Sequence, residues 1–257
     1  MSIWIFDPAR IKPILGLIIV TSLAACGSKK FPSPAKPQGT TITVGGKSLV
    51  IAGPSGFCMD RSVSQIRADT AFVLLGNCAV VAPQNRGPQP KVKALLTATI
   101  AENLQGPVTE TATEMDSFFR SEAGRTALSR ASDPGTVRVL DSFESGGTYF
   151  LRSTDSSPGI VPDAAADNWR GYFDVDGQLI SVSVIGFNSD PITPEASLDT
   201  ARAFARAIQI SNGNTISTAS AEPAIAPQTE PEPTAAKSRY SKVMSLNRVG
   251  ILRRIFW

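Results

Sequence analysis

Three two-residue turns constrain the fold of this chain more than any other feature of its sequence. Gly45-Gly46, Gly146-Gly147 and Asp176-Gly177 each stand between segments that are typical of strands. Residues of these types accept the positive φ angles that a tight β-hairpin requires. After the third turn, apolar and polar residues alternate over 180–184, which indicates a strand with one covered face and one more polar face. The sequence therefore predicts antiparallel hairpins.

Two other segments change to a helical period. Apolar residues recur every four positions over 115–127, and Thr111 and Glu114 have the spacing of a capping box just before them. A second apolar stripe covers 198–208 and follows Thr193-Pro194, a pair suited to the N-terminus of a helix. The sequence therefore predicts two helices, one in the middle of the chain and one after the last hairpin.

Hairpins followed by helices, without regular βαβ alternation, are typical of an α+β domain with a mostly antiparallel sheet. Residues 71–82 and 92–101 add two further buried strands. We expect this domain to span residues 41–212, with about two helices packed on one face of the sheet. The order of the elements resembles that of the PsbP-like domains. This is a resemblance of fold alone, because no motif carries it.

The N-terminus carries the signals of export. Arg10 and Lys12 precede an uncharged run at 13–25 that ends at Cys26. This run is shorter than the roughly 20 apolar residues that a membrane-spanning helix needs. A basic start, a short apolar core and small residues before a cleavage point form the pattern of a secretory signal peptide, which we place at residues 1–25. An uncleaved anchor is the alternative.

Residues 23–26, Leu-Ala-Ala-Cys, resemble the lipobox of bacterial lipoproteins. The resemblance implies that Cys26 is acylated on its sulfur, becomes the N-terminus after cleavage and anchors the chain in a membrane by its lipid. Gly27 at the next position, where Asp would favour the inner membrane, implies the outer membrane with the domain facing the periplasm. Several acyl chains anchor a protein stably in a membrane, because each buried methylene group contributes about 0.8 kcal/mol to membrane binding. Residues 26–40, rich in Pro, Ser, Gly and Lys, indicate a flexible tether.

Cys58 and Cys78 form an even pair once Cys26 is assigned to the lipid. Export places both in an oxidising compartment, and 19 residues lie between them. Closing a loop of that size contributes roughly 3 kcal/mol in the chain-entropy model. We therefore predict a structural disulfide that joins the turn around Cys58 to a strand-like run that holds Cys78. A redox-active pair is the alternative, but the spacing is not Cys-x-x-Cys.

The charges are unevenly distributed along the chain. Residues 41–212 hold 14 basic and 18 acidic residues, a net charge of −4, whereas 26–40 hold three basic residues and 237–257 hold six, each without an acidic one. A nucleic-acid-binding domain would carry its basic stripe on the folded part, so we expect no nucleic-acid partner. The chain has no His, which excludes mechanisms that need an imidazole base. We expect no cofactor and no metal.

The other candidate sites carry weak signals. Residues 174–177, Asp-Val-Asp-Gly, match a fragment of a calcium loop, but the later ligand positions lack side-chain oxygens, so a hairpin turn is the prediction. The segment at 53–56 is typical of a turn, with a ligand-contacting loop as the alternative, and the segment at 152–159 is typical of a solvated loop. Asp60 and Trp169-Arg170 are the remaining candidates for a surface site. Trp169 is interpreted as a packing residue, with a sugar platform as the alternative.

The C-terminal part has two compositions. Residues 213–236 are rich in Pro, Ala, Thr, Ser and Glu and indicate a disordered linker. Residues 237–257, the basic-apolar tail, add Val, Leu, Ile, Phe and Trp to the six basic residues, without a clean helical face. We expect this tail to contact an anionic membrane surface or an envelope protein, with packing back on the domain or no role as alternatives. The expected contact residues are Arg248, Arg253, Arg254, Phe256 and Trp257.

These features predict a non-enzymatic lipoprotein of the cell envelope that acts as a structural or interaction module. The alternative is a periplasmic module that binds a small ligand or a glycan, or an enzyme that depends on carboxylates, because a carboxylate pair is set by separation in space. A deep pocket with convergent polar side chains would favour the alternative. A shallow surface with an apolar patch would favour the interaction module.

Overall fold

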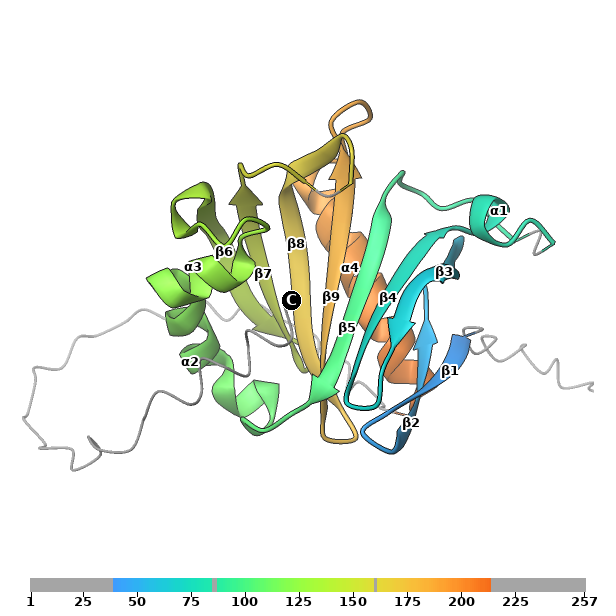
Figure 1. Ribbon diagram of the computed structural model, residues 1–257, viewed down its shortest axis with the longest axis horizontal. Coiled ribbons are helices and arrows are strands. Elements are labelled where there is room, and N and C mark those ends of the chain that lie inside the picture. Colours follow the sequence, from blue (N-terminus) through green and yellow to red (C-terminus); the bar gives the residue numbers. More distant parts are fainter. Residues whose placement is uncertain (1–38, 85–86, 160, 214–257) are drawn as a thin grey trace, which may run out of the picture. The chain divides into compact units, whose positions relative to one another are not determined.

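The computed structural model describes residues 39–84, 87–159 and 161–213. Within them the chain forms an α+β fold with two antiparallel sheets (Figure 1). The strands are β1 (Gly39–Val44), β2 (Lys47–Ala52), β3 (Phe57–Ile66), β4 (Thr70–Asn77), β5 (Leu95–Glu102), β6 (Val137–Ser145), β7 (Thr148–Asp155), β8 (Ala164–Val175) and β9 (Gln178–Phe187). The helices are α1 (Cys78–Val81), α2 (Val108–Arg120), α3 (Glu122–Leu128) and α4 (Pro194–Ser211).

The main sheet has seven strands in the order β3-β4-β5-β9-β8-β7-β6, and every neighbouring pair is antiparallel. Strands β1 and β2 form a separate two-stranded sheet. The predicted antiparallel hairpins are therefore confirmed. All three predicted turns are also confirmed, because Gly45-Gly46, Gly146-Gly147 and Asp176-Gly177 have positive φ angles and each joins two paired strands.

One face of the main sheet is covered by α4. The helix buries Ala201, Phe204 and Ile208 against strand residues that are fully buried, such as Val182 and Val184. The β1–β2 hairpin adds its own apolar side chains to the same core. The predicted alternation on β9 is confirmed in part: Ile180, Val182 and Val184 face this core, but the expected more polar face is also largely covered, since Ser181 is buried and Leu179 belongs to a second core.

The opposite face is covered by α2 and α3, which lie in front of the sheet in Figure 1 while α4 lies behind it. Tyr149 and Tyr172 pack against Phe119 of α2, whereas their chain neighbours Phe150 and Phe173 belong to the core under α4. Successive residues of a strand point to opposite faces, so β7 and β8 contribute to both cores. The expectation that the helices share one face is therefore wrong.

The predicted middle helix is divided in two. Helix α2 ends before Ser121, whose hydroxyl accepts a hydrogen bond from the Gly124 N–H and so caps α3. The predicted capping box at Thr111 is also wrong, because α2 begins at Val108. The Val108 N–H donates to a carboxylate oxygen of Asp174 on β8 at 2.5 Å. A residue distant in the sequence thus supplies the acceptor that a free helix N-terminus needs.

Several predicted segments lie outside the described residues: the signal peptide at 1–25, the tether up to residue 38, the linker from residue 214 and the basic-apolar tail. Cys26, Arg248, Arg253, Arg254, Phe256 and Trp257 lie there as well. No helix in the part of the chain that the structure describes is long and apolar enough to span a membrane.

Candidate functional site

An open groove of about 740 Å³ lies between the edge of the main sheet and the β1–β2 hairpin. Strand β3 is the terminal strand of the main sheet and pairs on one side only, with β4. The start of β1 lines the other side of the groove with Gly39 and Thr40. At the far end of the hairpin, the Gly45 N–H donates to the Ala68 carbonyl at 2.7 Å, which joins the hairpin to the β3–β4 turn.

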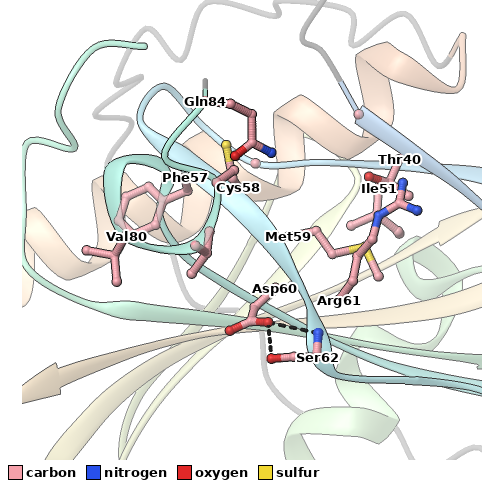
Figure 2. Close-up of a pocket in the computed structure, with 14 residues that line it drawn as sticks. Thr40, Ile51, Phe57, Cys58, Met59, Asp60, Arg61, Ser62, Val80 and Gln84 are labelled. Carbon is pink, nitrogen blue, oxygen red and sulfur yellow. Dashed lines mark hydrogen bonds between the residues drawn. The ribbon is translucent and has the colours of Figure 1, made fainter. Parts of the chain in front are cut away.

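The groove has a mixed lining, in which apolar side chains lie along its floor and on the wall formed by α1. Figure 2 shows Met59 of β3 between Phe57 and Val80 on one side and Ile51 on the other. Ile51 and Phe57 belong to the core, and Met59 packs against it. Val80 of α1 is different, because 74% of its surface is exposed. An exposed valine beside an apolar floor gives the groove an apolar contact surface open to solvent.

A disulfide fixes α1 against β3 and so shapes this wall. The sulfurs of Cys58 and Cys78 are 2.05 Å apart, which confirms the predicted pairing. The Cys78 N–H donates to the Gly56 carbonyl, and the Asn77 side chain accepts from the Ala79 N–H to begin α1. The prediction that Cys78 lies in a strand is wrong, because β4 ends at Asn77 and the chain turns into α1.

The predicted turn at 53–56 is confirmed and forms the link between the hairpin and β3. The Phe57 N–H donates to the Pro54 carbonyl at 3.0 Å. Gly56 has a φ of +89°, and a Cβ there would lie 2.4 Å from the backbone nitrogen of Pro90. Glycine is therefore required by both conformation and space. Gly53 lines the groove, a role that the sequence did not reveal.

Asp60 supplies the carboxylate of the groove. It accepts hydrogen bonds from the Ser62 hydroxyl at 2.6 Å and from the Ser62 N–H at 2.9 Å, both drawn in Figure 2. These bonds hold the pKa of Asp60 below its usual value, so the group is charged at neutral pH. The Ser64 hydroxyl donates to the Asp60 carbonyl and accepts from the Leu74 N–H, inside the bulge that interrupts β3. Asp60 is therefore confirmed as a surface group beside Arg61, which is exposed.

Trp169 and Arg170 do not form a surface site. Trp169 is only 3% exposed and packs in the core beside Phe143, so packing is confirmed and a sugar platform is excluded. Arg170 donates to the Leu128 carbonyl at 3.1 Å and so holds the end of α3 against the sheet. The calcium-loop fragment forms the predicted hairpin turn, in which the Asp176 carbonyl accepts from Lys47.

Several other carboxylates hold the fold together. Asp174 binds the start of α2 and the Asn103 amide, while Asp116 contacts Arg120 and Ser142. Asp155 lies in the segment predicted to be a solvated loop, but it is only 2% exposed. It accepts from the backbone and side chain of Arg130 and from Ser157. Asp60 is the only carboxylate among the described residues that line the groove.

Comparisons with known proteins add little. No protein-family model and no curated protein matches the sequence. Among solved structures, the chain is weakly similar to Smlt3025, an immunity protein of the Stenotrophomonas maltophilia type IV secretion system. The two are 10% identical with a TM-score of 0.32, and the similarity covers 68% of this chain and 92% of that chain. A TM-score this low supports no inference about family or function.

Proposed function

We propose that this protein is a lipid-anchored lipoprotein of the cell envelope, and that its domain acts as a non-enzymatic interaction module. The observation that carries the proposal is the open groove, in which an exposed apolar residue, Val80, stands on a wall fixed by a disulfide. The groove presents an exposed apolar wall and an unpaired strand edge, which are features of peptide and protein contact surfaces. With a single carboxylate in its described lining, it lacks the acid and base pair of a carboxylate-dependent hydrolase.

The anchor and the groove are close along the chain. Twelve residues separate Cys26 from Gly39, which lines the groove. A fully extended segment of that length spans about 40 Å. A lipid on Cys26 would therefore keep the groove within that distance of the membrane surface. With the domain facing the periplasm from the outer membrane, its partner would be another envelope protein.

The anchor is tested by the Cys26→Ser variant. We expect the wild-type protein to remain with membranes and to incorporate a labelled fatty acid, and the variant to lose both properties. Fractionation of cells that separates inner from outer membranes measures the first property and places the protein in one of them. The variant with both Cys58 and Cys78 replaced by Ser is the control and should still be acylated. Equal acylation of the Cys26 variant would contradict the proposal.

The interaction role is tested by photo-crosslinking in living cells. A photoreactive residue at Val80 is expected to capture one identified envelope protein. The same residue at Leu140, which is 44% exposed on β6 at the opposite edge of the sheet, should not capture it. Capture should fail when Met59 is replaced by Lys in the groove. Identical captures from Val80 and Leu140 would contradict a role for the groove.

Binding of a small ligand is the second candidate, because the groove volume falls in the range of small-molecule sites. Soluble peptidoglycan fragments and periplasmic oligosaccharides are the probes. If one of them protects the backbone amides of 57–62 from hydrogen exchange, and Met59→Lys removes that protection, this candidate replaces the protein partner.

A further inference from the structure

We propose that the groove is the docking site for the basic-apolar tail of the same chain, residues 237–257. The tail would then compete with any partner of the groove. The contact lies within one chain, so it is measured in the absence of a partner and stands or falls separately from the proposed function. Four observations carry it: where α4 ends, how long the linker is, the chemistry of the groove and the free edge of β3.

Helix α4 ends beside β2, one of the strands that line the groove. Its cap residue Asn212 forms two hydrogen bonds with the backbone of Val50 on β2, each 2.8 Å long. The next residue of β2, Ile51, lines the groove. The last described residues of the chain are therefore fixed to the strand that forms one side of the groove.

The linker is long enough to bring the tail back. Residues 214–236 separate the end of α4 from the tail, a stretch of 23 residues. A flexible chain of that length has a root-mean-square span of roughly 26 Å, at 5–6 Å times the square root of its length. Such a linker gives an effective concentration on the order of 1 mM for the tail at a site that it can reach.

The chemistry of the tail fits the groove. The tail joins six basic residues to Val, Ile, Leu, Phe and Trp, whereas residues 41–212 have a net charge of −4. The groove offers apolar surface at the half-buried Met59 and the exposed Val80, and the charged carboxylate of Asp60. Arg61 is the opposing charge. The basic residues of the tail would therefore be attracted by the carboxylate of Asp60 and repelled by the guanidinium group of Arg61.

The edge of β3 supplies the backbone contacts. Within the described residues β3 is paired with β4 alone, so no further strand covers its other edge, although the Phe57 and Ser62 N–H groups already have local acceptors. An extended segment that adds to such an edge gains main-chain hydrogen bonds, and alternate side chains enter the adjacent pockets. Val249, Ile251, Ile255 and Phe256 are residue types that suit an added strand.

Hydrogen exchange on the purified full-length chain tests the proposal. A tail that binds with a dissociation constant of about 0.1 mM, at an effective concentration on the order of 1 mM, is protected about tenfold. We expect this protection in residues 237–257 but not in 214–236, and slower exchange of the amides of 57–62. Val80→Lys should abolish both effects, because it removes an apolar contact and adds a repelling charge.

Two further variants sharpen the test. Leu140→Lys makes the same change at an exposed site on the far edge of the sheet and should leave the protection intact. Arg61→Glu removes the opposing charge and should increase it. Since Val80, Leu140 and Arg61 are exposed, these variants should fold, which circular dichroism checks.

Three results would overturn the proposal. The first is a tail that exchanges as fast as the linker in the wild-type chain. The second is protection that survives Val80→Lys. The third is protection that appears only with vesicles containing anionic lipid and is unaffected by Val80→Lys, which would assign the tail to the membrane surface.

Discussion

Asp155 shows how a charged side chain is accommodated in the interior of this protein. Burial alone would raise its pKa, but hydrogen bonds from the Arg130 N–H and from the hydroxyl and N–H of Ser157 lower the pKa to about 2. The Arg130 side chain also donates to the Asp155 carboxylate and to its carbonyl. One carboxylate therefore ties the end of α3 to the end of β7.

This environment predicts how stability depends on pH. The pKa of Asp155 is 3.8 without these contacts and about 2 in the fold, so the carboxylate contributes about 2 kcal/mol at neutral pH. Because the folded pKa is the lower one, this contribution is present above pH 4 and is lost as the pH falls from about 4 to about 2. Asp155→Asn should remove that part of the pH dependence, as measured by denaturant unfolding at pH 2.5 to 7.

Asp199→Asn is the control for this prediction. Its side chain is 77% exposed and lies 3.6 Å from Arg202 in a surface pair, which contributes little to stability. We expect the unfolding curve of this variant to follow that of the wild-type protein over the same range. If the unfolding free energy of Asp155→Asn varied with pH as in the wild-type protein, the loss of stability in acid would come from other groups.

The break between α2 and α3 depends on Gly124. A Cβ at this position would lie 1.9 Å from the Phe118 carbonyl oxygen and 2.5 Å from the Phe119 Cα. These are backbone atoms, which cannot rotate away as a flexible side chain can. The two short helices can therefore pack closely only because residue 124 has no side chain.

Gly124→Ala is thus expected to destabilise the protein by about 2–3 kcal/mol, as overpacking does in a well-packed core. In an ordinary helix the same change would be favourable. Gly87→Ala is the control, because nothing lies within 4 Å of a Cβ at that position, and its stability should match the wild type. Thermal and denaturant unfolding measure the stability of both variants. An increase in the stability of Gly124→Ala would contradict the prediction, because it would mean that α2 and α3 can move apart without loss of stability.

The helices also show the limit of prediction from sequence. The 3.6-residue period predicted helical structure over both segments, and Thr193 was correctly identified as the cap of α4, where its hydroxyl accepts from the Ala196 N–H. The start of α2 depends on Asp174, 66 residues away, and no local pattern contains that contact. The packing of helices on both faces of the sheet was not predicted. Tyr149 and Tyr172 lie on the strand face that a period-two pattern assigns to solvent, but in the structure both are buried under α2.

The candidate site was only partly predictable for the same reason. Residue type and compartment predict the two cysteines and Asp60; Cys58 and Asp60 line the groove, and Cys78 is joined to Cys58 by the disulfide. The groove itself is formed by segments from β1, β2, β3 and α1 that meet through tertiary packing. Val80 belongs to an apolar run in the sequence, and only the turn at Asn77 places it on the surface.

At the scale of the whole molecule, the disulfide is the covalent link between the groove wall and the sheet edge. Its two cysteines are 20 residues apart, and removal of a crosslink over such a loop costs about 3 kcal/mol in the chain-entropy model. Replacing both Cys58 and Cys78 by Ser should therefore lower the free energy of unfolding by about that amount. Denaturant unfolding of the variant and of the reduced wild-type protein measures the loss.

The effect of this change should also be local. We expect faster amide exchange in residues 57–62 and 78–84, and unchanged exchange in the central strands β8 and β9, which pair over most of their length. Uniformly faster exchange would instead mean that the disulfide stabilises the whole domain and not the groove wall. Single substitutions are unsuitable controls, because each leaves a free thiol.

The position of Gly39 has a mechanical consequence. If the chain is anchored through Cys26 as we propose, a load applied at the anchor would enter the described fold at Gly39, which pairs with Ala52 at the open end of the hairpin. The hydrogen bonds between β1 and β2 would then be loaded one after another, as in unzipping, and this geometry yields at low force. Under the proposed anchoring, the hairpin would therefore be the first described element to open under load.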